Sequence, residues 1–171
     1  MSRRAAKKPL LSSKNIRDRL IFCRRYRDWT AEDWGKVIFS DESPFQLFGT
    51  SGRRLVWRRR GERSHQSCLM PTVKHPETIH VWGCFSVKGV GSLTILPKNT
   101  AMNKEWYQNV LREQLLPTIQ GQFGDEECLF QHNGGPCNKA EVITKWLGKR
   151  NIKVLAPWLE NSPDLNSIED L

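Results

Sequence analysis

The chain has 171 residues, of which 38% are apolar, which is enough for one domain with a hydrophobic core. No segment approaches the 18 consecutive apolar residues of a membrane-spanning helix, so this pattern excludes a helical membrane span. The net charge of +9 and the pI near 9.6 favour a polyanionic partner, nucleic acid first, over a membrane or a small-molecule substrate.

The positive charge is concentrated at the N-terminal end. Residues 1–30 contain ten Lys or Arg against Asp18 and Asp28, a net of +8, so the rest of the chain is near neutral. We expect residues 1–12 to form a basic disordered tail. This composition superficially matches a mitochondrial transit peptide, but we favour a basic linker, which explains the same composition. A second basic block comprises Arg53, Arg54, Arg58, Arg59, Arg60 and Arg63.

Residues 13–36 are expected to form a basic helical linker. Ser12 or Ser13 can cap a helix whose apolar positions recur at helical spacing: Ile16, Leu20, Cys23 and Tyr26. Thr30 to Asp33 resembles a capping box that opens one helical turn before the first strand. The five cysteines form no CxxC pair and no zinc-spaced cluster, so we expect reduced thiols in an intracellular protein.

Strand signals dominate the next part of the chain. Residues 37–40 (VIFS) predict a buried strand that delivers Asp41 at its end. Residues 45–48 and 54–59 predict one hairpin, turned by the glycine-containing segment between them. Residues 78–85 and 91–96 predict a second hairpin, with Gly89 and Gly91 in or near its turn.

Helices then alternate with strands. Helices are predicted at 103–114, with the apolar stripe continuing through Leu116, and at 139–150, with Val142, Ile143, Trp146 and Leu147 inward. Strands are predicted at 127–131 and 152–155, and a helix starts at Asp164. This order predicts an α/β layer fold with a mixed central sheet flanked by helices.

Three motifs stand out: VIFSDES at 37–43, FQHNGGP at 130–136 and SPDLNSIEDL at 162–171. Together they resemble the catalytic domain of Tc/mariner superfamily transposases, the cut-and-paste DDE enzymes. Asp41 matches the first of the family's three metal-holding acids, and Glu169 matches the third. Asn133 stands where the family has the second aspartate, 92 residues after Asp41 and 36 before Glu169.

The resemblance implies a ribonuclease-H-like fold over residues 37–171 and DNA transposition in the nucleus. Such enzymes cleave a phosphodiester of double-stranded DNA and then transfer the strand. The implied catalytic residues are Asp41, Asn133 and Glu169, and the implied metal ligands are Asp41 and Glu169. The implied cofactor is a pair of magnesium or manganese ions, since hard cations prefer carboxylate oxygens. The family also implies homodimers.

Departures from the family pattern predict that this copy is catalytically defective. Asn133 brings no negative charge, Gly134 and Gly135 replace Asn followed by Asp or Ala, and Asn138 replaces the usual His. We also expect the upstream helix-turn-helix modules to be missing and the last catalytic-domain helix to be truncated.

Neighbouring residues have simpler interpretations. A lone Asp after a strand is usually a turn or cap residue, but the surrounding motif favours a site role for Asp41. Glu42 is expected to be a solvated neighbour, and Asp164 an N-cap, or alternatively a fourth carboxylate. His132 has no partner at ligand spacing, so it is not assigned to a metal.

An alternative to the transposase is a non-catalytic, sequence-independent nucleic-acid-binding remnant, and a third possibility is a transposon-derived reading frame without a cellular role. The candidate phosphate-binding residues are Arg24, Arg25, Arg53, Arg54, Arg58, Arg59 and Arg60.

Overall fold

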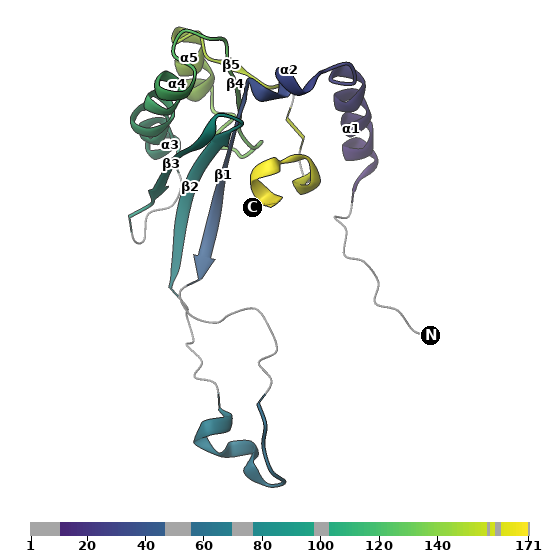
Figure 1. The fold of residues 1–171 in the computed structure, drawn as a ribbon, viewed down its shortest axis with the longest axis vertical. Coiled ribbons are helices and arrows are strands. Elements are labelled where there is room, and N and C mark those ends of the chain that lie inside the picture. Colours follow the sequence, from purple (N-terminus) through teal and green to yellow (C-terminus); the bar gives the residue numbers. More distant parts are fainter. Residues whose placement is uncertain are drawn as a thin grey trace.

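A mixed five-stranded sheet organises the computed structural model, which describes residues 11–46, 56–69, 77–97, 103–156, 158–159 and 162–170. The strand order is β3-β2-β1-β4-β5 (Figure 1). The strands are β1 (Val37–Gln46), β2 (Thr78–Ser86), β3 (Gly89–Ile95), β4 (Leu129–Gln131) and β5 (Lys153–Val154). β1, β2 and β3 pair antiparallel, whereas β4 and β5 add to β1 in parallel. The predicted fold class and the hairpin of β2 and β3 are confirmed.

The central strand β1 is longer than predicted. It pairs with β4 only from Val37 to Phe39, but with β2 as far as Gln46. Asp41 therefore lies in the middle of a strand, opposite Gly83, and not at a strand end. The predicted buried strand over 37–40 is confirmed, but the prediction that it ends at Asp41 was wrong, because the antiparallel partner β2 keeps β1 extended after the parallel partner β4 has ended.

The predicted hairpin of 45–48 with 54–59 is not the pairing that forms. Phe45 pairs with Ile79 of β2 instead, and residues 56–59 are not in a strand. Residues 47–55, with the predicted turn, lie outside the described residues. The segment 56–69 contains two short 3₁₀ turns, η1 (Glu62–Ser64) and η2 (Gln66–Cys68).

One long helical segment covers a face of the sheet. It consists of α3 (Lys104–Val110), a π-helical turn η3 (Leu111–Leu115) and α4 (Leu116–Gln122). Asn103 caps its start by accepting a hydrogen bond from the backbone N–H of Trp106 at 2.8 Å. Pro117, which has no backbone N–H to donate, lies in the first turn of α4. The prediction at 103–114 is confirmed, although the helix continues further.

Helix α5 (Glu141–Lys149) packs beside α3 on that face. Ile143, Trp146 and Leu147 are buried as predicted, but Val142 is 48% exposed. The prediction for Val142 was wrong because one residue is a 100° rotation, which turns Val142 away from the face that its three neighbours share.

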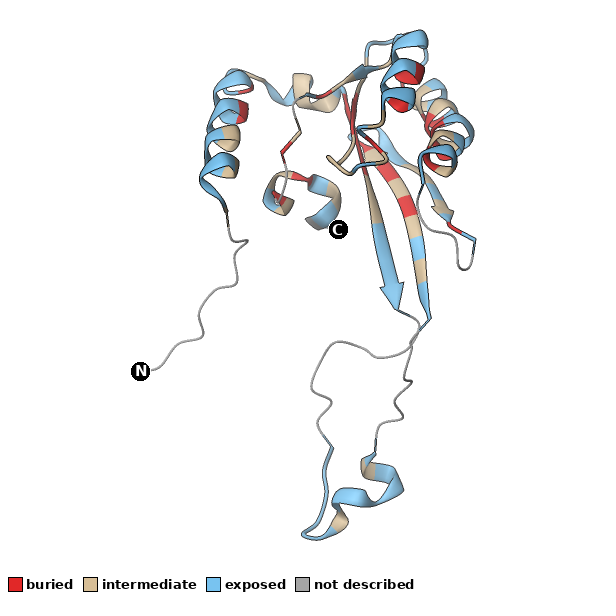
Figure 2. Ribbon diagram, turned by 180° about the vertical axis from the view of Figure 1, so that it is seen from behind, coloured by how far each residue is buried: buried red, intermediate tan, exposed pale blue. Residues whose placement is uncertain are grey.

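Two hydrophobic clusters lie on opposite faces of the sheet, as the alternation of β1 dictates. Ile38 joins the cluster under α3, α4 and α5, with Trp82 and Phe130. Val37 and Phe39 point the other way and pack with α1 (Ser13–Arg25) and the chain after β5. Figure 2 shows the buried residues gathered where helices cover the sheet, while the far ends of β1 and β2 are exposed.

Helix α1 buries a different face from the one predicted. Ser12 caps it, but Ile16 is 49% exposed and Leu20 is exposed as well, whereas Phe22 and Tyr26 are buried. The prediction for Tyr26 is thus confirmed, and the predictions for Ile16, Leu20 and the exposed Cys23 were wrong. The helix carries two apolar stripes, and the aromatic one faces the sheet because it buries more surface.

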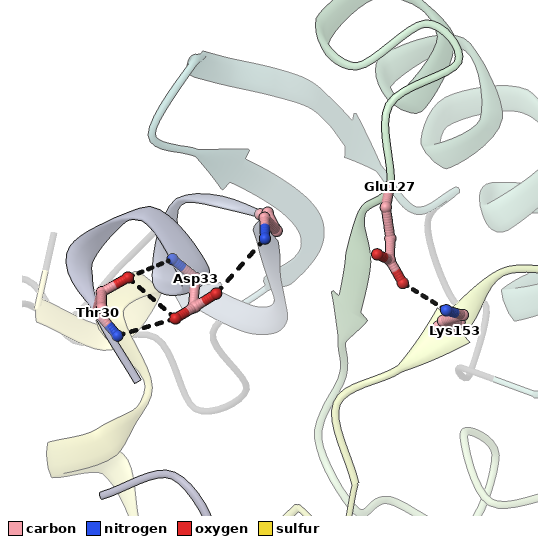
Figure 3. Close-up of polar contacts among 5 residues, drawn as sticks. Thr30, Asp33, Glu127 and Lys153 are labelled. Carbon is pink, nitrogen blue, oxygen red and sulfur yellow. Dashed lines mark hydrogen bonds and ion pairs between the residues drawn. The ribbon is translucent and has the colours of Figure 1, made fainter. Parts of the chain in front are cut away.

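The connection from α1 to the sheet is fixed by the short helix α2 (Ala31–Gly35). The Thr30 hydroxyl accepts from the backbone N–H of Asp33, and the Asp33 carboxylate accepts from the Thr30 backbone (Figure 3), which confirms the predicted capping box. These hydrogen bonds lower the pKa of Asp33. Figure 3 also shows Lys153 of β5 paired with Glu127 just before β4.

The chain after residue 161 does not form the predicted helix. It forms two 3₁₀ turns, η4 (Pro163–Leu165) and η5 (Ser167–Asp170). Asp164 lies inside η4, so the N-cap prediction for it was wrong. All five cysteines are free thiols. In the described part of the chain, no helix is long and apolar enough to cross a membrane.

Candidate active site

Parallel pairing of β1 with β4 brings two of the three predicted site residues together. Asn133 follows the end of β4 by two residues, and its side-chain Nδ2 donates a hydrogen bond to Oδ1 of Asp41 at 3.1 Å. The strand pairing brings Asn133 close to Asp41, because Phe39 of β1 is opposite Gln131 of β4 and both strands run in the same direction. The contact joins residues 92 positions apart in sequence.

Glu169 reaches the same place through an intermediary that the sequence analysis missed. Asn166, which is 1% exposed, donates from Nδ2 to Asp41 Oδ2 at 3.4 Å and to Glu169 Oε1 at 3.2 Å. Asp41, Asn133 and Glu169 therefore converge, as the motif order predicted. The Oδ1 atom of Asn166 is buried without a hydrogen-bond partner among the described residues. The SPDLN motif contains Asn166, but only the structure shows that it joins the two acids.

Glu42 is part of the site, which corrects the expectation of a solvated neighbour. Its Oε2 accepts from Asn133 Nδ2 at 2.6 Å, and its Oε1 accepts from Asn138 Nδ2 at 3.4 Å. Burial, together with the charge of Asp41, raises the pKa of Glu42 to about 7, against the effect of these two amide donors. Two carboxylates thus face one amide group, and Glu42 titrates near neutral pH.

The orientation of the Asn133 amide is fixed from both sides. Its Oδ1 accepts from the backbone N–H of Gly135 at 3.0 Å and from Asn138 Nδ2 at 2.6 Å. A backbone N–H can only donate, and a carboxylate can only accept, so the amide oxygen must face Gly135 and the NH2 must face the acids. A Cβ added at Gly135 would lie 3.0 Å from that oxygen, so the glycine leaves room for this turn.

This arrangement does not fit a divalent cation. An NH2 group, and not an oxygen, points at the space between Asp41 and Glu42, and the amide oxygen is used by Gly135 and Asn138. The amide of Asn166 also stands between Asp41 and Glu169. Among the described residues, no group of three or more His, Cys, Asp or Glu is placed to hold a metal ion.

His132 is a packed residue beside the site. Its ring stacks near Phe130 and Tyr107, with centroids 5.2 and 6.2 Å away, and its Nδ1 is 3.2 Å from the Tyr107 hydroxyl oxygen. Burial, and then the charge of Lys139, lowers the pKa of His132 to about 4. The imidazole is therefore neutral at physiological pH, and its contacts with Phe130 and Tyr107 account for its position without a metal.

Two cavities adjoin the site, and both are lined by Asn133, Gly134, Trp158 and Leu159. One, of about 420 Å³, extends to Lys14, Asp18 and Ile21 of α1. The other, of about 410 Å³, extends to Glu169. Gly134, in the loop after β4, borders both cavities, and of the predicted site acids only Glu169 lines one of them.

The described candidate phosphate-binding arginines are exposed. Arg24 and Arg25 end α1, and the Arg25 guanidinium lies 5.7 Å from the centre of the Tyr26 ring. Arg58, Arg59 and Arg60 are exposed in the segment 56–69, whereas Arg53 and Arg54 lie outside the described residues. The basic side chains are thus available to a polyanion but are not part of the acid cluster.

Curated relatives cover nearly the whole chain. The chain is 36% identical to the transposable element Tcb2 transposase of Caenorhabditis briggsae and 34% identical to the Tc1 transposase of Caenorhabditis elegans. Each match spans 170 residues, 99% of this chain and 61% of the relative, so the chain spans about three-fifths of the length of these relatives. No family model matches the chain.

Solved structures show the same fold. The Mos1 transposase paired-end complex with left transposon end superposes with a TM-score of 0.81 at 18% identity, over 99% of this chain and 50% of that one. The catalytic domain of Mos1 mariner transposase superposes with a TM-score of 0.70 at 17% identity, over 96% and 71%. Other Mos1 structures are described with Mg or Mn.

Proposed function

The homologues of this chain are Tc1/mariner transposases and its fold is that of their catalytic domain, and from this premise we propose that it is a DNA transposase domain that binds double-stranded DNA but is defective in cleavage. The relatives support transposition as the reaction of the lineage. The site geometry supports the loss of activity in this chain. A nuclear location follows from the proposed DNA substrate.

One observation carries the proposed defect: the NH2 of Asn133 points between Asp41 and Glu42. In transposition a phosphodiester is hydrolysed and the freed 3′ hydroxyl then attacks target DNA, and a pair of divalent cations supplies the charge that both displacements need. Asn133 turns the positive end of its amide dipole towards Asp41 and Glu42, and it contributes no negative charge to offset such cations. Loss of a ligating group costs on the order of several kcal/mol of transition-state stabilisation, and each 1.36 kcal/mol is about tenfold in rate.

Binding to DNA is supported by charge and by the comparison with Mos1. The net charge is +9, and the described arginines of α1 and of segment 56–69 are exposed. Mos1 is described in complexes with transposon ends, and its paired-end complexes support a homodimer here. We infer sequence-independent contacts to phosphates by Arg24, Arg25, Arg53, Arg54, Arg58, Arg59 and Arg60.

Nicking of a supercoiled plasmid tests the proposed defect. The natural chain, the Asn133→Asp variant and an Asp41→Ala control are each assayed with magnesium or manganese. We expect trace nicking at most from the natural chain and a partial gain for Asn133→Asp, because the amide of Asn138 still occupies the neighbouring position. Robust nicking by the natural chain that Asp41→Ala abolishes would overturn the proposal.

The alternative, a non-catalytic nucleic-acid-binding remnant, is favoured by the same amide arrangement. Fluorescence anisotropy with a duplex of arbitrary sequence tests it. About six phosphate contacts give a slope of log affinity against log salt of roughly −5. Replacing Arg24 and Arg25 by Gln should reduce that slope by about 2. Affinity that does not change with salt would exclude phosphate binding by these arginines.

A further inference from the structure

An ion pair joins the first described helix to the last turns of the chain. Arg19 of α1 donates from Nη1 to Asp164 Oδ1 at 2.8 Å and from Nη2 to Asp164 Oδ2 at 2.5 Å. The two residues are 145 positions apart, and the Arg19 side chain is only 22% exposed. Two parallel hydrogen bonds fix the direction as well as the distance between the two side chains, so this contact links η4 to α1.

The same face of α1 makes two further contacts to the C-terminal part of the chain. The Phe22 ring meets the Trp158 ring edge to face at 5.7 Å, and the Tyr26 hydroxyl donates to the Ala156 carbonyl at 2.8 Å. Arg19, Phe22 and Tyr26 lie at positions i, i+3 and i+7 and therefore on one side of the helix. Helix α1 thus follows the chain from β5 towards η4.

The segment that carries Glu169 is not a strand of the sheet, and side-chain contacts hold it against α1 and β1. Residues 162–170 form two 3₁₀ turns, closed by short-range bonds such as that from Asn166 N to the Pro163 carbonyl at 3.0 Å. Leu165 and Ile168 are partly buried against the cluster that contains Phe22 and Tyr26 of α1 and Val37 and Phe39 of β1. Asp164 therefore stands two residues before Asn166 and five before Glu169, at the start of the turns that place both side chains.

We propose that Arg19 is a positioning residue: its ion pair with Asp164 holds the turns that let Asn166 bridge Asp41 and Glu169. The seating of α1 then determines where the Glu169 carboxylate lies relative to β1. Arg17 and Arg24 are exposed on the outward side of α1, where a polyanion can reach them. One side of the helix would therefore position Glu169 and the other would bind a polyanion. Asp41 itself is held by the sheet and does not depend on Arg19.

Amide hydrogen exchange of the full chain tests this positioning directly. Arg19→Gln and Asp164→Asn should each speed exchange in residues 164–170 about two- to fivefold, without change in β1. The reversed pair, Arg19→Asp with Asp164→Arg, should restore protection. Arg17→Gln, on the outward side of the same helix, is the matched control and should have no effect. Unchanged exchange in both single variants, or no restoration by the reversed pair, overturns the proposal.

A second readout separates positioning from a merely structural contact, and it rests on the proposed function. In the Asn133→Asp background, manganese affinity is measured by electron paramagnetic resonance. Adding Arg19→Gln should weaken that affinity several-fold, and adding the reversed pair instead should recover it. Affinity that Arg19→Gln leaves unchanged despite faster exchange would reduce Arg19 to a structural role. If Asn133→Asp binds no manganese, the proposed function fails, and the exchange experiment still decides the role of Arg19.

Discussion

Two regions of this molecule hold the same site in different ways. Asp41 sits on β1, the central strand of the sheet, which pairs with β2 on one side and with β4 on the other. Glu169 is exposed on a 3₁₀ turn that is held by side chains: the ion pair of Arg19 with Asp164 and the hydrogen bonds of Asn166. The sheet side of the site is therefore as stable as the whole fold, whereas the Glu169 side can open locally.

The largest effect on stability is expected from a substitution in the sheet region. Phe130 of β4 is fully buried in the cluster under α3 and α5. The variant Phe130→Ala should lower the free energy of unfolding by about 3–5 kcal/mol, because it leaves a cavity that the packed helices cannot fill. Urea denaturation followed by circular dichroism measures this loss. A loss below about 1 kcal/mol would show that β4 is not part of the cooperative core.

A smaller and more local effect is expected from the α1 side. Phe22 packs against Tyr26 and Trp158, so Phe22→Ala should cost about 2–3 kcal/mol and loosen residues 162–170 before the sheet opens. Ile16→Ala, on the exposed side of the same helix, is the control and should change stability by less than about 0.5 kcal/mol. Hydrogen exchange distinguishes the two regions. An equal increase of hydrogen exchange in β1 and in residues 162–170 would show that the two regions do not differ in local stability.

The pH dependence of stability probes the junction between the two regions. Folding raises the pKa of Glu42 from 4.5 to about 7, so the folded state binds its proton more tightly than the unfolded state. The contribution of Glu42 to stability is thus complete below pH 4.5 and is lost as pH rises through 7. Glu42→Gln should remove this fall and raise stability at pH 8 by about 1–3 kcal/mol. Parallel pH profiles for both proteins would show that Glu42 is not buried.

Sequence reasoning succeeded where local pattern determines structure. The capping box of Thr30, the cap of α1 by Ser12 and the hairpin of β2 and β3 each depend on residues within a few positions. The convergence of Asp41, Asn133 and Glu169 was predicted from the order of the three motifs, because a family that shares these motifs is expected to share the fold that brings them together.

Failures occurred where the deciding partner is distant in sequence. The length of β1 follows its pairing with β2, Glu42 lies against Asn133 and Asn138, and Asp164 in the turns after residue 161 pairs with Arg19. The inward face of α1 could not be chosen between two apolar stripes until the packing with Trp158 was known. None of these contacts can be recognised from the residues that are near one another in the sequence.

The central claim is that the Asn133 amide takes the place of a cation between carboxylates, and manganese titration tests it most directly. Binding is followed by electron paramagnetic resonance and by thermal melting, for the natural chain, for Asn133→Asp and for Asn133→Asp with Asp41→Ala. We predict no saturable binding and no change of Tm for the natural chain. Asn133→Asp should melt at a lower temperature in chelator and regain stability with manganese, and Asp41→Ala should abolish that gain. Saturable manganese binding by the natural chain that is lost in Asp41→Ala would contradict the account.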